Sequence, residues 1–71
     1  AGLRWRALQL RRELARRSPA RLRVHAAPDL HAFLTGAGSG WQAFADRQGG
    51  AVVLEADRAL APGSHRIMEL S

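Results

Sequence analysis

The sequence predicts an α+β fold, a two-layer sandwich in which helices cover one face of a three-stranded mixed sheet. Its 71 residues permit one small domain, because a chain of this size buries only about 60% of its unfolded surface. Hydrophobic residues make up 46% of the chain, which is enough for a modest core. Apolar positions follow helical and alternating periods in the order helix, strand, helix, helix, strand, strand (α-β-α-α-β-β).

The first helix is predicted over residues 3–17. Apolar side chains recur there at steps of four, three and four residues, at Leu3, Ala7, Leu10 and Leu14. Trp5 lies at the edge of this stripe. Ser18 and Pro19 end the helix, because proline disfavours helical backbone in the residue before it.

The next predicted elements are a strand over residues 21–26 and a short helix. In the strand, an apolar face alternates with a basic face that contains Arg21, Arg23 and His25. Pro28 suits the first position of the helix, and Gly36 ends it. Its apolar face consists of Leu30, Phe33 and Leu34.

A glycine-rich connection over residues 36–40 leads into the third helix. Ser39 and Gln42 fit a capping box at its start, and the Gly-Gly pair at residues 49–50 fits its end. Residues 52–56 are mostly apolar, so we expect this strand at the centre of the sheet. A helix pair joins it to the first strand, which predicts that these two strands are parallel. The third strand, at residues 65–70, returns antiparallel.

Positive charge is concentrated at the start of the chain. All eleven basic residues are Arg, and the net charge is +5. Residues 1–23 hold eight Arg and one acid, giving +7, whereas residues 24–71 hold three Arg and five acids, giving −2. We therefore distinguish a leading, connecting basic helix (1–18) from the small α+β domain (19–71), with one domain in all.

The charge distribution favours nucleic acid as a partner. Arginine makes bidentate contacts with phosphate. The candidate RNA-contacting residues are Arg11, Arg12, Arg16, Arg17, Arg21 and Arg23. The alternative interpretation is a solvated helix face.

The apolar stripe of the first helix supports a second hypothesis, contact with a partner chain. The candidate partner-contacting residues are Leu3, Trp5, Ala7, Leu10 and Leu14. Two heptads are a weak coiled-coil signal, so packing of this stripe on the chain's own sheet is the alternative.

The composition excludes several classes of function. Without cysteine there is no disulfide framework, thiolate metal site or cysteine nucleophile. The carboxylates and the three His match no catalytic or zinc spacing, so we expect no catalytic residue, metal site or cofactor. No apolar run approaches the roughly 20 residues that span a bilayer, and no signal peptide is visible, so we expect a cytoplasmic chain without a membrane partner. Because no Met begins it, we expect a piece of a longer chain.

Four segments together resemble the C-terminal small domain of the ribonuclease E/G family. Residues 22–34 read LRVHAAPDLHAFL, the next helix ends with DRQGG at 46–50, and the last two strands read VVLEAD at 52–57 and HRIMEL at 65–70. The helix at 3–17 resembles the one that connects this domain to the rest of such enzymes. The similarity covers nearly the whole chain and rests on a hydrophobic pattern, not on catalytic residues.

The resemblance implies a noncatalytic C-terminal module of an endoribonuclease that cuts single-stranded RNA in RNA processing and decay. Such a module supports subunit assembly and contacts RNA. In the parent enzyme, carboxylates elsewhere would use magnesium, and thiolate motifs would bind zinc between the subunits of a homo-oligomer. The alternative is a stand-alone basic RNA-binding module that uses the Arg face of the first helix and strand.

The element order also resembles a KH-like sheet with two helices. KH domains clamp RNA with a GXXG loop between those helices. Here the connection has Gly36, Gly38 and Gly40, with no two glycines three apart. This resemblance therefore implies the fold without the KH mode of binding RNA.

Overall fold

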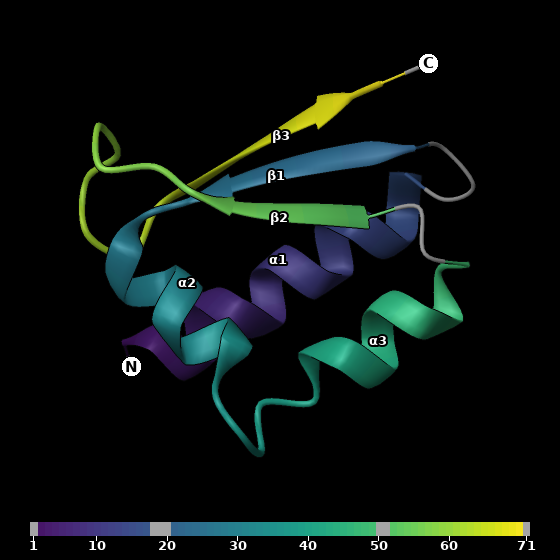
Figure 1. Ribbon diagram of the computed structural model, residues 1–71, viewed down its shortest axis with the longest axis horizontal. Coiled ribbons are helices and arrows are strands. Elements are labelled where there is room, and N and C mark those ends of the chain that lie inside the picture. The colour runs from purple at the N-terminus through teal and green to yellow at the C-terminus, as the bar shows by residue number, and fades with distance from the viewer. Residues whose placement is uncertain (1, 18–20, 50–51, 71) are drawn as a thin grey trace.

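The computed structural model describes residues 2–17, 21–49 and 52–70. Its elements are α1 (Leu3–Arg17), β1 (Leu22–Ala26), α2 (Pro28–Thr35), α3 (Trp41–Arg47), β2 (Val52–Ala56) and β3 (His65–Glu69) (Figure 1). This order confirms the α-β-α-α-β-β prediction. Ser18, Pro19 and Gly50, which we expected to end helices, lie outside the described residues.

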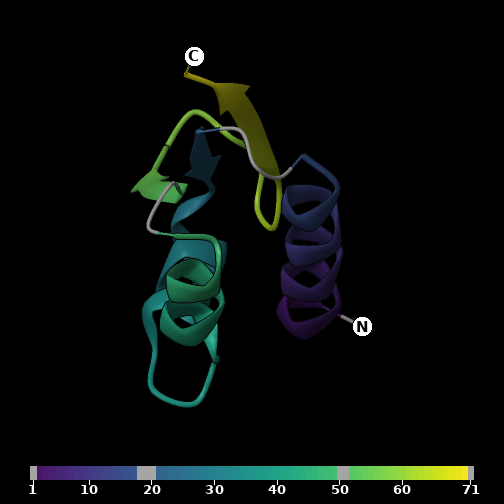
Figure 2. The same cartoon turned by 90° about the vertical axis from the view of Figure 1, so that its right-hand side faces the viewer.

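The three strands form one mixed sheet in the order β2-β1-β3. β1 is parallel to β2 and antiparallel to β3, as predicted. Figure 2 shows all three helices on the same side of the sheet, which gives the two-layer sandwich. None of the helices in the described part of the chain therefore covers the opposite face of the sheet.

The prediction that residues 52–56 form the central strand was wrong. β1 is central, and β2 is an edge strand. The apolar run in β2 includes Val53, whose side chain is 45% exposed on the uncovered face. β1 instead alternates, with Leu22, Val24 and Ala26 buried beneath it. A half-buried pattern can thus belong to a central strand when only one face of the sheet is covered.

The core lies between the sheet and the helices. Its buried cluster consists of Ala7, Leu10, Leu14, Leu22, Val24, Ala26, Leu30, Leu34, Trp41 and Phe44. Trp41 and Phe44 pack with ring centroids 5.5 Å apart, a tilted arrangement that aromatic pairs favour. These two aromatic residues therefore serve the core and are not available to stack on a base.

Local hydrogen bonds position the short helices. Asp29, at the start of α2, accepts the backbone N–H of Gly63 at 2.9 Å and so ties this helix to the loop before β3. The predicted capping box of α3 is not formed. Ser39 Oγ accepts the N–H of Trp41, and Gln42 Nε2 donates to Asp46 one turn on. Gly40 takes the N-cap position in a left-handed conformation, so Ser39 lies one residue before the position from which a capping-box serine acts.

Candidate nucleic-acid interface

The helix α1 presents two different faces. Ala7, Leu10 and Leu14 are at most 2% exposed and belong to the core of this chain, with Leu3 packed against them. Three of the five candidate partner-contacting residues therefore offer no surface to another chain in this structure. Trp5 differs, because 49% of it is exposed, as is 39% of Leu8. A tryptophan and a leucine thus stand in solvent on one basic helix.

Three of the six candidate arginines lie on the exposed part of α1, close to its C-terminal end. Arg12, Arg16 and Arg17 are exposed, and none of them forms an ion pair with another described residue. The single acid of α1, Glu13, instead contacts His65 of β3, with 3.1 Å between Oε1 and Nε2. The guanidinium groups on this surface are therefore not neutralised by their own helix.

Arg11 has a structural contact that the sequence did not indicate. Its guanidinium donates a hydrogen bond to the backbone carbonyl of Ser39 and lies against Gly40. The Nε atom is buried and has no hydrogen-bond partner among the described residues. Arg11 thus links α1 to the glycine-rich loop, and only part of its donor set can face a ligand.

Arg21 and Arg23 lie on a different surface. Their neighbours Leu22 and Val24 point into the core, so alternation along the strand directs both arginines to the uncovered face of the sheet. The Nε of Arg23 is 3.0 Å from Glu55 Oε1 in the adjacent strand. The six predicted arginines therefore do not form one patch. They divide between α1 and the far side of the sheet, where Glu55 pairs with Arg23.

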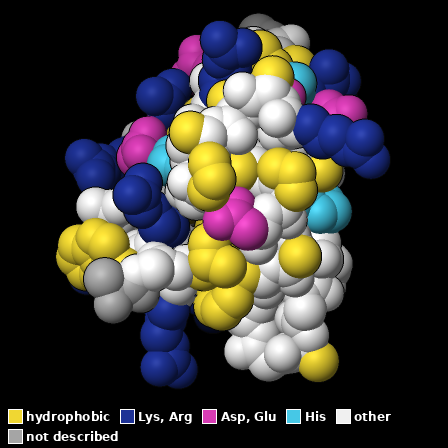
Figure 3. Space-filling model, turned by 90° about the vertical axis from the view of Figure 1, so that its left-hand side faces the viewer, with side chains coloured by type: hydrophobic (Ala, Val, Ile, Leu, Met, Phe, Trp, Pro, Cys, Tyr) yellow, Lys and Arg dark blue, Asp and Glu magenta, His cyan; other side chains and the backbone are white. Residues whose placement is uncertain are grey.

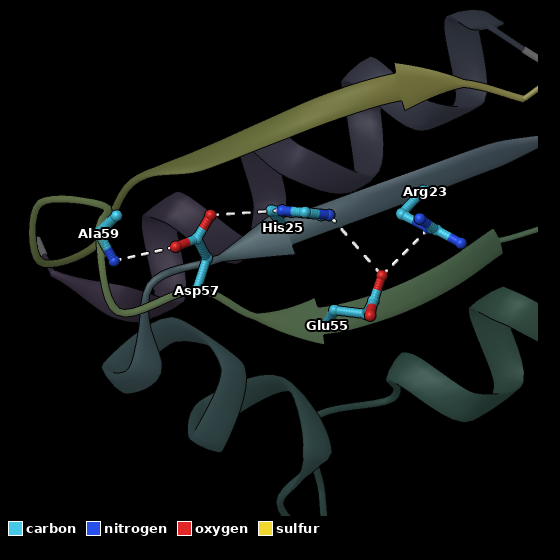
Figure 4. A network of polar contacts seen from close by, with 5 residues as sticks. All are labelled: Arg23, His25, Glu55, Asp57 and Ala59. Atoms are coloured by element: carbon cyan, nitrogen blue, oxygen red, sulfur yellow. Dashed lines mark hydrogen bonds and ion pairs between the residues drawn. The ribbon is translucent and has the colours of Figure 1, made fainter.

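A polar network on the uncovered face includes His25 (Figure 4). Its Nδ1 is 3.3 Å from Asp57 Oδ2, and its Nε2 is 3.7 Å from Glu55 Oε1. Hydrogen bonding from the backbone N–H of Ala59, and then from His25, lowers the pKa of Asp57 below its ordinary value of 3.8. The network joins β1, β2 and the loop after β2 on the surface.

Sequence reasoning missed this network. The relevant signal is the parallel register that places His25 opposite Glu55, and this register follows only from the strand order. Within the described ranges, no three His, Asp or Glu side chains are arranged to hold a metal ion.

A groove separates the N-terminal half of α1 from the end of α2 and the following loop, with a volume of about 1080 Å³. From α1 it is lined by Arg4, Trp5, Ala7, Leu8 and Arg11. The opposite wall comprises Ala32, Phe33 and residues 36–39. No acidic side chain is among these lining residues. Figure 3 shows hydrophobic side chains standing beside arginines on the side of the molecule from which α1 begins.

None of the helices described here is long and apolar enough to cross a membrane. No protein-family model, curated protein or solved structure matches this chain. Three features of the described residues bear on function. They are a basic exposed surface on α1, a groove beside it with no acid among its lining residues, and a sheet face that none of the described helices covers.

Proposed function

We propose that this chain is a noncatalytic module of a ribonuclease E/G-like endoribonuclease, which contacts RNA in the cytoplasm during RNA processing and decay. The observation that carries the proposal is the exposed arginine cluster of α1, Arg12, Arg16 and Arg17. These side chains have no acidic partner among the described residues, and arginine recognises phosphate through paired N–H donors. The resemblance to the small domain of that family supports the choice of RNA.

Catalysis lies outside this proposal. The chain has no cysteine, and the residues that the structure describes hold no three metal-ligating side chains together. They therefore do not fit the zinc or magnesium that the resemblance implies for a parent enzyme. In this proposal both metals belong to other parts of that enzyme, and this module acts by binding alone.

Fluorescence anisotropy with a labelled single-stranded RNA tests the proposal. If three arginines contact phosphates, log affinity falls against log salt with a slope of about −2. Raising the salt from 50 to 200 mM then weakens binding roughly 20-fold. Binding that is absent at low salt, or that does not respond to salt, overturns the proposal.

A charge-matched pair of variants locates the contact. One variant changes Arg12, Arg16 and Arg17 to Glu. The control changes to Glu the three arginines that lie beyond residue 23, Arg47, Arg58 and Arg66. Each reversal removes two units of charge, so three reversals take the net charge from +5 to −1 in both variants. We expect the first variant to lose RNA binding and the control to keep most of it. Equal losses would show that net charge, and not the surface of α1, determines binding.

Subunit assembly is a second candidate function, favoured by the uncovered face of the sheet. Val53 of β2 is 45% exposed there, and Leu70, which directly follows β3, is 42% exposed. Exposed apolar side chains on a bare sheet face are typical of surfaces that other chains or domains cover. Sedimentation velocity at increasing concentration tests whether this chain associates with itself. A monomer at all concentrations contradicts assembly through this chain alone.

The stand-alone RNA-binding module remains the alternative, and it uses the same arginines. The two proposals differ in what lies upstream of residue 1 in the full gene product. A nuclease region with carboxylates, followed by two short cysteine motifs, supports the ribonuclease assignment. A gene product without such a region supports the stand-alone module.

A further inference from the structure

The groove beside α1 contains an aromatic side chain that the core does not use. Trp5 is 49% exposed and Leu8, almost one turn further on, is 39% exposed. Phe33 on the opposite wall is only partly buried. Exposed apolar groups that lie together are typical of binding surfaces, and these three side chains line the same groove.

The groove's surroundings are positive. Arg4 and Arg11 line it, and no acid is among its lining residues. On the opposite wall Gly38 has no neighbouring atom within 4 Å of the position that a Cβ would occupy. The loop therefore forms a low wall made largely of backbone, and the groove is open to a flat group that enters from solvent.

Trp5 is aligned with the arginines of the proposed RNA contact. Arg12 and Arg16 follow it by seven and eleven residues, which correspond to about two and three turns of helix. All three side chains therefore leave α1 on nearly the same side. With a rise of about 1.5 Å per residue, Arg12 lies roughly 10 Å along the axis from Trp5. An aromatic ring at one end and two guanidinium groups further along match a ligand that carries bases and phosphates.

We propose that this groove binds an unpaired base of single-stranded RNA, stacked on Trp5, while the backbone continues along Arg12 and Arg16. This inference rests on the proposed RNA-binding function and identifies the kind of RNA that is bound. Base stacking on an aromatic side chain tolerates any sequence, because every base has a π-face. A base within a duplex is already stacked on its neighbours, so a duplex leaves this groove empty.

Substitution of Trp5 tests the inference separately from the parent proposal. Trp5→Ala should weaken binding of single-stranded oligouridylate roughly 5- to 150-fold. The slope of log affinity against log salt should not change, because Trp5 carries no charge. Trp5→Phe, which keeps an aromatic face, should restore most of the affinity. The matched control is Val53→Ala, which removes an exposed apolar side chain from the uncovered face of the sheet and should leave RNA binding unchanged.

The possible outcomes separate the two proposals. If Trp5→Ala binds RNA like the unaltered protein while the Arg12, Arg16 and Arg17 variant does not, the stacking site is refuted and the proposed function stands. If the unaltered protein does not bind RNA, both are refuted. If Trp5→Ala instead abolishes self-association in sedimentation and leaves RNA binding intact, the groove binds a second copy of this chain and the inference is overturned.

A spectroscopic measurement provides a second readout that does not depend on affinity. In a Trp41→Phe background, Trp5 is the only tryptophan, since the chain contains two. We expect single-stranded RNA to quench its fluorescence at saturation, and a duplex of equal length to bind without quenching. An equal response to both would contradict stacking. If Trp41→Phe does not fold, the same comparison in the unaltered protein serves, because Trp41 is only 7% exposed.

Discussion

Replacement of Leu10 by Ala tests whether α1 belongs to the core or to an interface with another chain. Leu10 is 0% exposed and lies in the buried cluster between α1 and the sheet. Leu→Ala changes at such sites cost about 3 to 5 kcal/mol, because the lost transfer free energy is increased by the cavity that remains. For 71 residues the free energy of unfolding is expected to be about 4 to 11 kcal/mol. Leu10→Ala should therefore remove about a quarter of it or more.

Urea titration followed by far-UV circular dichroism measures this loss. A small domain has a denaturant slope of about 1 kcal/mol per M, so the midpoint should fall by roughly 3 to 5 M. Leu8→Ala is the matched control, because it makes the same chemical change on the same helix at a position that is 39% exposed. We expect Leu8→Ala to cost about 1 kcal/mol or less.

The comparison between the two variants decides the question. If Leu10→Ala costs no more than Leu8→Ala, α1 is not packed on the sheet in solution, and its apolar stripe is again available to a partner chain. If Leu10→Ala leaves the chain unfolded while Leu8→Ala folds, the result still places Leu10 in the core. Leu10→Met then provides a finer test, because this change nearly conserves volume and should cost less than about 1.5 kcal/mol.

Two further predictions concern the loop between β2 and β3. The pKa of Asp57 is lower in the folded protein than its ordinary value of 3.8. The ionised carboxylate therefore stabilises the fold above pH 3.8, and this stabilisation is lost as the pH falls through the pKa of Asp57 in the folded protein. The urea midpoint should therefore decline below pH 4, and Asp57→Asn, which still accepts the N–H of Ala59, should flatten this decline. If the midpoint declines equally steeply in both proteins, protonation of Asp57 is not the cause of the decline. Gly63 is buried with φ of 77°, so Gly63→Ala should cost about 1 to 2 kcal/mol in the same titration. A change smaller than 0.5 kcal/mol would show that the loop can adopt another conformation.

Local patterns predicted the elements better than their arrangement. The period of apolar residues in α1 and the alternation in β1 reflect which side of each element is buried, and both predictions agree with the structure. The position of β2 depends instead on which strand pairs with which. Val53 contributes to an apolar run in the sequence, yet it lies on the uncovered face. A run of apolar residues does not indicate how many of them are buried when one face of a sheet is bare.

In the candidate site, too, local patterns predicted some features, whereas others depend on how the elements pair. That Arg12 and Arg16 lie on an exposed helix surface follows from their spacing relative to the buried stripe. That Arg23 meets Glu55 follows only from the parallel register of β1 and β2. The contact of Arg11 with the carbonyl of Ser39 joins residues 28 positions apart, and nothing in the local sequence indicates it. Charge counts can therefore locate a basic segment, but they do not show which of its side chains are free to bind.

The two faces of α1 make the stability and binding experiments independent of each other. Leu10 points into the core, whereas Arg12 lies two residues on, about 200° around the helix axis, and is exposed. Substitutions without shared contacts usually have additive effects. A variant of Arg12 that loses RNA binding at an unchanged urea midpoint has therefore lost a contact and not its fold. A variant of Leu10 that retains its salt-dependent affinity whenever it is folded shows that the buried stripe positions the arginines without contacting RNA.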